Sequence, residues 1–407
     1  MWATVALALA AAAPAQAQQD FSYADRLYGV VTTDDGDRYE GFLRWTDNEG
    51  SWSDFLNGDK ELDEEHLRQA RELGDERERR GFSILGIRIS FDHDGSTEAS
   101  SGLRFGHIAS LERRRGGRAE IVLLSGETVE LDGGSSDIGS GMSLTIEDPS
   151  RGTVELDWGD LERVDFAEAP AGARSLAQRL YGTLRTQEGS TFTGFVAWDS
   201  DEILTSDVLD GEEKGRDREI PFVNIASIHR FSSSGARVVL TNGEEIVLKD
   251  SNDVDDGNRG IIIADPQLGQ VTVDWDEFLD LTFSPAPADA APRSRFDGGR
   301  PLRGTVELAD GRSISGAIRW DNDEEFSWEG LDGEADYVEM DIEFANIASI
   351  RRLGDDAAEI TLRDGRTFEM SGSNDVDDHN KGIFVTDADG RVAMVRWDDF
   401  RTVRFDD

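Results

Sequence analysis

The run 224–228, NIASI, and the run 251–256, SNDVDD, both occur a second time, at 346–350 and 373–378. The offset is 122 residues in each case. Working outward from these runs, Arg179–Phe283 matches Pro301–Phe405 at the same offset without a gap. Chance does not keep register over such a length, so the chain contains tandem copies of one unit.

An earlier segment, 26–166, carries the same landmarks in the same order but is longer. The offset to the next copy is 153 at Trp45 and 117 at Ile108, so an insertion of about 36 residues separates them, within 46–102. Part of this insertion, 62–80, has the composition of an exposed charged helix. We therefore expect one helical insertion in the first copy.

Three tandem repeats follow from these matches. They are 26–166 (repeat 1), 179–283 (repeat 2) and 301–407 (repeat 3). The joints between them, 167–178 and 284–300, are rich in Pro and Ala and predict semi-rigid spacers between separately folded units.

Within a repeat, short apolar runs alternate with polar residues and turn signals, which predicts β-strands. Residues 180–186 and 192–198 read as one hairpin, and Asn242-Gly243 lies between the apolar runs 238–240 and 246–248. The fold class that this pattern predicts is all-β.

The strand, glycine turn, strand and closing run with apolar residues at 220, 222, 225 and 228 resemble the tandem small β-barrels, SH3-like or Sm-like, of exported bacterial proteins of unknown function. The resemblance implies a pair of small barrels per repeat, and a two-sheet sandwich is the alternative. Sm-like barrels often bind RNA. The formal net charge of −43 repels nucleic acid, so we expect no nucleic-acid partner.

Residues 1–17 form an apolar stretch that ends in Ala15-Gln16-Ala17, the pattern of a signal peptide. This predicts export to the periplasm or exterior of a bacterium. Nothing later in the chain supplies the roughly 20 apolar residues that a spanning helix needs, so no membrane insertion is expected. The chain has no Cys, which excludes disulfides and cysteine nucleophiles.

The SNDVDD runs gather hard oxygen donors of the kind that Ca²⁺ prefers. The candidate ligands are Asp253, Asp255, Asp256 and Asn258 in repeat 2 and Asp375, Asp377, Asp378 and Asn380 in repeat 3. Repeat 1 keeps only Asp137. The alternative is that these side chains cap turns through their own backbone. A second acidic run, 199–202 and its copy 321–324, either completes the site or is a solvated loop.

Two Trp recur in each repeat: Trp45, Trp198 and Trp320 are expected to end one strand, and Trp158, Trp275 and Trp397 to lie in the last strand. Such recurrence is typical of a core, whereas Trp52 and Trp328 stand outside the pattern and are the better candidates for surface contacts. No zinc pattern, nucleophile elbow or phosphate loop occurs, so no catalytic residue is assigned.

The function that this sequence predicts is a non-enzymatic binding or scaffold module, with Ca²⁺ as the candidate cofactor in the loops of repeats 2 and 3. Tandem repeats give avidity for a repetitive partner, and that partner would be a glycan or protein of the envelope or exterior. The rival hypothesis is an exported carbohydrate-active enzyme that uses paired carboxylates and exposed Trp. Ligand identity and oligomeric state do not follow from the sequence.

Overall fold

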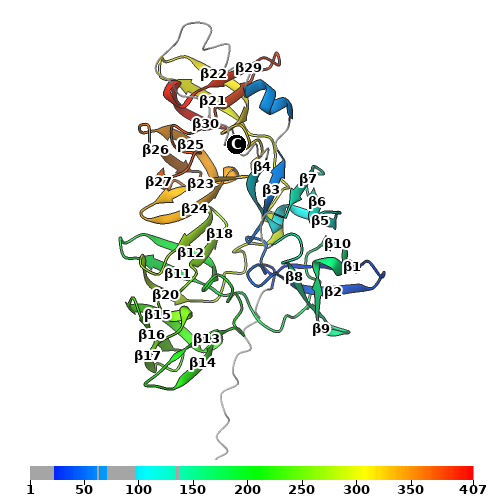
Figure 1. Ribbon diagram of the computed structural model, residues 1–407, viewed down its shortest axis with the longest axis vertical. Helices are drawn as coiled ribbons and strands as arrows, with labels where there is room; N and C mark the ends of the chain where they lie inside the picture. Colours follow the sequence, from blue (N-terminus) through cyan, green and yellow to red (C-terminus); the bar gives the residue numbers. More distant parts are fainter. Residues whose placement is uncertain (1–22, 62–63, 71–97, 134–136, 407) are drawn as a thin grey trace, which may run out of the picture.

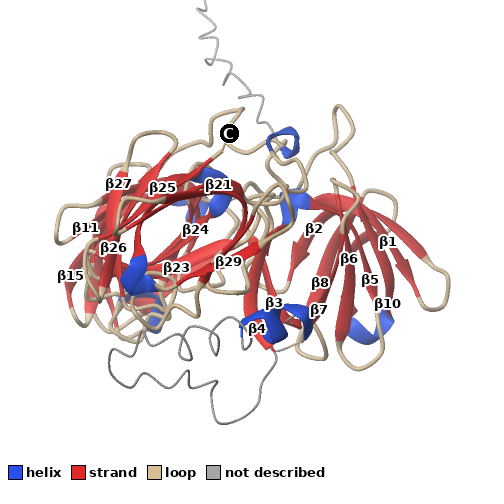
Figure 2. Cartoon of the chain, turned by 90° about the horizontal axis from the view of Figure 1, so that it is seen from above, coloured by secondary structure: helices blue, strands red, loops and turns tan. Residues whose placement is uncertain are grey.

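The structure is a computed structural model that describes residues 23–61, 64–70, 98–133 and 137–406, so the expected signal peptide lies outside the described residues. Its regular structure is mostly strand, arranged in large antiparallel sheets, which confirms the all-β class (Figure 2). Figure 1 shows repeats 2 and 3 stacked along the long axis, with repeat 1 beside them. No helix among the described residues is long and apolar enough to cross a membrane.

Within the described residues, each repeat contributes ten strands. Those of repeat 1 are β1 Tyr28–Thr33, β2 Arg38–Trp45, β3 Phe55–Glu61, β4 Glu98–Arg104, β5 Ile108–Arg113, β6 Arg118–Leu123, β7 Thr128–Asp132, β8 Ser143–Asp148, β9 Gly152–Asp157 and β10 Leu161–Phe166. Those of repeat 2 are β11 Tyr181–Thr186, β12 Thr191–Ala197, β13 Val208–Glu212, β14 Asp217–Pro221, β15 Ile225–Ser232, β16 Gly235–Leu240, β17 Glu245–Lys249, β18 Ile261–Asp265, β19 Gly269–Val273 and β20 Phe278–Phe283.

Repeat 3 follows the same plan. Its strands are β21 Arg303–Leu308, β22 Ser313–Arg319, β23 Gly330–Ala335, β24 Val338–Glu343, β25 Ile347–Arg352, β26 Ala357–Leu362, β27 Thr367–Ser371, β28 Ile383–Thr386, β29 Val392–Val395 and β30 Phe400–Phe405. Short 3₁₀ turns occur between strands, among them η3 Phe222–Asn224, η4 Asn252–Val254 and η6 Phe344–Asn346.

The three repeats have one strand order. In repeat 1 it is β4-β3-β7-β6-β5-β10-β1-β2-β8-β9. The pairings of repeat 2 give β14-β13-β17-β16-β15-β20-β11-β12-β18-β19, and those of repeat 3 give the same order ten strands further on. The strands of a repeat thus form one continuous antiparallel ladder. The pair of small barrels per repeat and its alternative, the two-sheet sandwich, both stay predictions.

Repeats 2 and 3 join edge to edge, because β19 pairs with β24. The closest approach is at Gly269, where a Cβ would lie 1.8 Å from the carbonyl oxygen of Asp341, so only glycine fits. Next to it, Leu268 is fully buried, and the apolar cores of the two repeats merge into one cluster. Because the two repeats share one apolar core, they form a single folded body rather than two separately folded units joined by a spacer.

The joint 284–300 also differs from the spacer that the sequence predicts. Its Arg293 donates hydrogen bonds to the carbonyl oxygens of Phe166 and Ile108 in repeat 1, at 2.7 and 2.8 Å. Its Phe296 packs edge-on against His107, with ring centroids 5.1 Å apart, and belongs to the core of repeat 1. This joint therefore ties repeat 1 to the other two.

The insertion of repeat 1 lies inside one hairpin. Strands β3 and β4 are the counterparts of β13–β14 and β23–β24, and the extra residues all fall between them, at 62–97. Of the expected charged helix 62–80, residues 64–70 are helical, and the other positions lie outside the described residues. Leu67 and Ala70 are buried, and His66 lies 3.5 Å from Glu325, so this helix contacts repeat 3.

Candidate functional site

An acidic turn follows the first recurring Trp of each repeat. In repeat 3, Trp320 pairs through its backbone with Glu324, and the tight turn between them places Asp321 and Asn322 at positive φ. The indole nitrogen of Trp320 donates to the carbonyl oxygen of Asp375, at 2.9 Å. The buried Trp thereby brings the acidic turn next to the SNDVDD loop, two segments far apart in the sequence.

In repeat 2, the predicted calcium ligands have other partners. The Asp253 carboxylate accepts from the backbone N–H of Asp210 in β13, at 2.7 Å, and burial raises the pKa of Asp253 to about 6. Asp255 and Asn258 accept from backbone N–H groups within their own loop, at 2.9 and 3.1 Å. Asp256 is exposed. The four side chains do not form a common acidic group.

Repeat 3 repeats this arrangement, with one addition. Asp375 accepts from the N–H of Asp332 at 2.8 Å, and Asn380 caps its own turn. Asp377 accepts from the N–H of His379, also at 2.8 Å. Here Asp377, Asp378 and His379 bring one ligand atom each within 4.8 Å of one another, on the surface.

The acidic run 199–202 is not a solvated loop, because Asp199 is fully buried. Asp199, Asp201 and Glu202 bring oxygens within 4.8 Å of one another. However, the guanidinium of Arg259 contacts Asp199 at 2.9 Å and Asp201 at 2.5 Å. Burial and the neighbouring carboxylates raise the pKa of Glu202 to about 9. A cationic side chain of the protein itself thus occupies this cluster.

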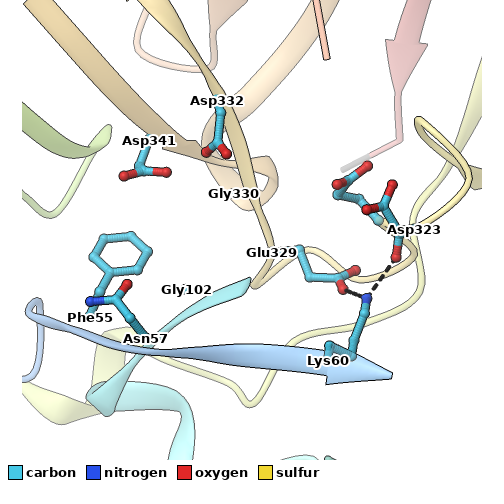
Figure 3. A pocket seen from close by; sticks show the side chains of 10 residues that line it. Phe55, Asn57, Lys60, Gly102, Asp323, Glu329, Gly330, Asp332 and Asp341 are labelled. Carbon is cyan, nitrogen blue, oxygen red and sulfur yellow. Dashed lines mark hydrogen bonds and ion pairs between the residues drawn. The ribbon is translucent and has the colours of Figure 1, made fainter. Parts of the chain in front are cut away.

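A cavity rich in carboxylates lies between repeats 1 and 3. This cavity, of about 220 Å³, is lined by carboxylates from the acidic turn, from the segment after it and from the β23–β24 hairpin, and by residues of β3 and β4. The acidic residues are Asp323, Glu324, Glu329, Asp332 and Asp341; the others include Phe55, Asn57, Lys60, Gly102 and Gly330. We call this the junction pocket (Figure 3).

Lys60 supplies the positive charge of the junction pocket. Its ammonium pairs with Glu329 and donates to the carbonyl oxygen of Asp323, at 2.7 Å. Burial opposes this charge, but the neighbouring carboxylates outweigh burial and raise the pKa of Lys60. Figure 3 shows this contact on one side of the pocket and the Asp332–Asp341 pair on another.

Among the remaining carboxylates of the pocket, Asp323 lies 3.9 Å from the ammonium of Lys381, yet the pKa values of these acids are raised. Burial raises the pKa of Asp323 to about 6 and that of Glu324 well above its ordinary value. One buried oxygen of each, Asp323 Oδ1 and Glu324 Oε2, has no hydrogen-bond partner. Asp332 and Asp341 face each other across β23 and β24, and burial followed by this neighbour raises the pKa of Asp341 well above its ordinary value.

The acid that Lys60 pairs with has a counterpart in every repeat. Asp54, Asp207 and Glu329 each accept two backbone N–H bonds in the turn that precedes β3, β13 or β23. Each also receives a basic side chain from a neighbouring repeat. The pairs are Arg179–Asp54 at 2.8 Å, Arg44–Asp207 at 3.2 Å and Lys60–Glu329.

Repeat 1 has its own version of the junction pocket, closed by repeat 2. This cavity is smaller, about 70 Å³, and its lining includes Asn48, Glu49, Asp54 and Asn57, with Arg179 from repeat 2. Asn57 is the counterpart of Asp332, because the N–H groups of both bond to the SNDVDD-loop acid of their repeat. The smaller cavity therefore holds two carboxylates where the junction pocket holds five.

A buried ion pair holds the junction next to the pocket. Arg104 of β4 and Glu343 of β24 lie 3.0 Å apart and are almost completely buried. His107 Nε2 lies 3.2 Å from the same carboxylate. Arg104 also donates to the carbonyl oxygens of Asp265 and Pro266 in repeat 2. One arginine thus connects all three repeats.

The Trp residues divide differently from the sequence-based expectation. The six recurring Trp are buried, as expected for a core. The prediction that Trp52 and Trp328 make surface contacts is wrong, because each is 1% exposed. Trp52 packs under the guanidinium of Arg293, and Trp328 of repeat 3 belongs to the core of repeat 1. Both are junction residues, which explains why they stand outside the repeating pattern.

The sequence reasoning did not single out Lys60, Glu329, Asp332 or Asp341. A signal for one of them was present, since Asp332 is the copy of Asp210 at the offset of 122. Lys60 lies within 46–102, the range to which the sequence comparison confined the insertion, so that comparison gave it no counterpart. No protein-family model, curated protein or solved structure matches this chain.

Proposed function

We propose that this protein is a non-enzymatic binding module whose ligand is a cation held in the junction pocket. The observation that carries the proposal is the charge of that pocket, five carboxylates around one ammonium between two repeats, where Asp323 and Glu329 are buried and Asp332 is exposed. The proposal keeps export to the periplasm or exterior as the expected location. It places the binding function at a junction of repeats rather than in the loops of single repeats.

The charges that line the junction pocket favour a cationic ligand. Carboxylates crowded out of water without matching positive charge either repel one another or hold protons, and both states give a positively charged ligand a favourable place. The walls belong to β3 and β4 of repeat 1 and to β23 and β24 of repeat 3. A ligand there contacts both repeats, so its binding free energy adds to the stability of their junction.

The test is thermal unfolding of the purified protein at low ionic strength, with inorganic and organic cations added one at a time. A cation that binds only the folded protein raises its melting temperature. Asp332→Asn with Asp341→Asn should abolish the rise. The matched control is Asp210→Asn with Glu219→Gln, the same cross-strand positions in repeat 2. No rise with any cation, or an equal rise in both variants, contradicts the proposal.

Calcium in the SNDVDD loops is a separate proposal that the same titration addresses. It draws support only from repeat 3, where Asp377, Asp378 and His379 lie close together. A Ca²⁺-selective rise that is lost in Asp377→Asn with Asp378→Asn, and kept in the pocket variants, would assign calcium to the loop. Mg²⁺ serves as the control ion.

The rival hypothesis of a carbohydrate-active enzyme finds no favouring observation. It relied on exposed Trp as stacking platforms, and every Trp in the described part of the chain is buried. Turnover of a glycan by the purified protein would nevertheless overturn the non-enzymatic assignment.

A further inference from the structure

The arrangement of the pocket carboxylates bears on the class of cation. A Ca²⁺ ion requires six to eight oxygens at about 2.3–2.6 Å from one point. The described residues contain two groups of three ligand atoms within 4.8 Å, and neither group belongs to the junction pocket. The five carboxylates are instead distributed around the wall, as Figure 3 shows. This spacing does not suit a single metal ion.

The same fold positions bind alkylammonium and guanidinium groups throughout the chain. Lys60, Arg44 and Arg179 each pair with the turn acid of a neighbouring repeat. Arg259 and Lys381 contact the acidic turn of their own repeat, with Lys381 lying 3.1 Å from Asp321. The chemistry that these acidic turns recognise is therefore an organic cation with N–H donors.

The pocket has two acidic regions that Lys60 does not neutralise. One is the cross-strand pair Asp332 and Asp341. The other is the acidic turn, where the 8% exposed Asp323 has one buried oxygen without a hydrogen-bond partner and the other 3.9 Å from Lys381. Glu324 of the same turn also has one buried oxygen without a hydrogen-bond partner. Phe55 and the backbone of two glycines complete the wall. Two acidic regions beside an aromatic ring match a molecule with a charge at each end and methylene groups between.

We propose that the ligand of the junction pocket is a short linear diamine. One ammonium pairs with Asp332 and Asp341, the other pairs with Asp323 and Glu324, and the methylene chain lies against Phe55. This inference rests on the proposed function, because it names the ligand class of the same pocket. Lys60 remains bound to Glu329 and leaves the other carboxylates to the ligand.

The experiment is isothermal titration calorimetry on the full chain with 1,4-diaminobutane, n-butylamine and Ca²⁺ as probes. We expect one diamine per chain, with n-butylamine binding at least about 10-fold more weakly because it lacks one charge-assisted contact. Asp332→Asn with Asp341→Asn should weaken diamine binding by about 100-fold or more. The control Asp210→Asn with Glu219→Gln should change it by less than about 2-fold, because those positions lie outside the pocket.

The outcomes separate the two proposals. If n-butylamine or Ca²⁺ binds as well as the diamine, and the pocket variant loses that binding, the pocket binds cations but the diamine assignment is overturned. If no cation binds at the pocket, both fall. Diamine binding that the pocket variant retains would reflect the overall negative charge and would also overturn the inference. Should the double variant not fold, Asp323→Asn alone carries the same test from the opposite acidic region.

Discussion

The two junction cavities are built from equivalent positions but differ in charge. Repeat 2 closes the cavity of repeat 1, where Glu49 and Asp54 face Arg179. Repeat 1 closes the cavity of repeat 3, where five carboxylates face Lys60. In the first, the packing of two repeats is nearly balanced in charge. In the junction pocket of repeat 3, the packing of the repeats does not account for the additional acids. Such a pattern is expected of a binding site, where groups kept for function lower the stability of the fold.

Three substitutions account for the difference. Where repeat 1 has Asn48, Asn57 and Gly102, repeat 3 has Asp323, Asp332 and Asp341. Asn57 donates from its side-chain amide to Asp137 at 2.9 Å, a contact that a carboxylate would turn into repulsion. In repeat 3 the corresponding acid, Asp375, has its pKa raised well above its ordinary value by burial first and then by neighbouring acids that include Asp332. The same strand positions thus form a nearly charge-balanced cavity in repeat 1 and a strongly acidic one, the proposed binding site, in repeat 3.

The largest expected effect comes from removing the ion pair between Arg104 and Glu343, which holds the repeats together. Arg104→Met should lower the free energy of unfolding by about 3–5 kcal/mol, because it leaves Glu343 buried without its cation. Chemical denaturation measures the loss. Adding Glu343→Gln should restore part of it, since the unpaired buried charge is then gone. A cost below about 1 kcal/mol for the single variant would mean that water reaches Glu343.

Removing Arg179 and removing Lys60, the basic residues of two inter-repeat ion pairs, should lower the free energy of unfolding by different amounts. Arg179→Met should cost about 3 kcal/mol under all conditions, because Arg179 is 4% exposed and pairs with the buried Asp54. Lys60→Met should cost about 2 kcal/mol, because Lys60 is more exposed. If the junction pocket binds an organic dication, that ligand should offset the Lys60 loss and leave the Arg179 loss unchanged. Equal rescue of both variants would contradict the distinction.

Much of this fold could be predicted from the sequence, because strand periodicity and repeat register are local signals. The Asn242-Gly243 turn forms where the pattern places it, between β16 and β17, and the six recurring Trp are buried. The junction pocket could not be predicted in the same way. It requires Lys60 and Glu329 to meet across 269 residues of sequence, and no periodicity encodes that contact.

The edge pairing of repeats 2 and 3 is equally hidden in the sequence. It depends on Gly269 approaching β24, yet Gly269 reads as an ordinary turn glycine. The expected calcium site is the reverse case, because the sequence predicted a site that the side-chain positions in repeat 2 do not form. The composition of the SNDVDD loop identified acidic residues, but in repeat 2 they do not converge: the side chain of Asp253 accepts from β13, and Asp255 caps its own turn. Composition specifies donor types, whereas backbone geometry decides where each donor points.

The pH dependence of the free energy of unfolding tests the charge of the junction pocket, because Asp323 lines it. The folded-state pKa of Asp323, about 6, lies above its ordinary value of 3.8, so the folded protein holds this proton more tightly than the unfolded chain. As pH rises from about 4 to 6, this group therefore reduces stability, by on the order of 2 kcal/mol. Asp323→Asn should remove this part of the loss, as seen in denaturation curves at pH 4, 5, 6 and 7. Parallel pH profiles for variant and wild type would contradict the assignment.

The smallest expected effects test whether the SNDVDD loops of repeats 2 and 3 are equivalent. In chelator, Asp255→Ala and Asp377→Ala should each cost about 0.5–1 kcal/mol, because each side chain caps a turn through one backbone N–H. The two costs should match, since the caps have the same geometry. In millimolar Ca²⁺ they should diverge only if the loop binds metal, because Asp377 has Asp378 and His379 beside it whereas the counterpart of His379 in repeat 2 is Gly257. Equal costs with and without Ca²⁺ would make both loops turn caps and leave the junction pocket as the cation site of the chain.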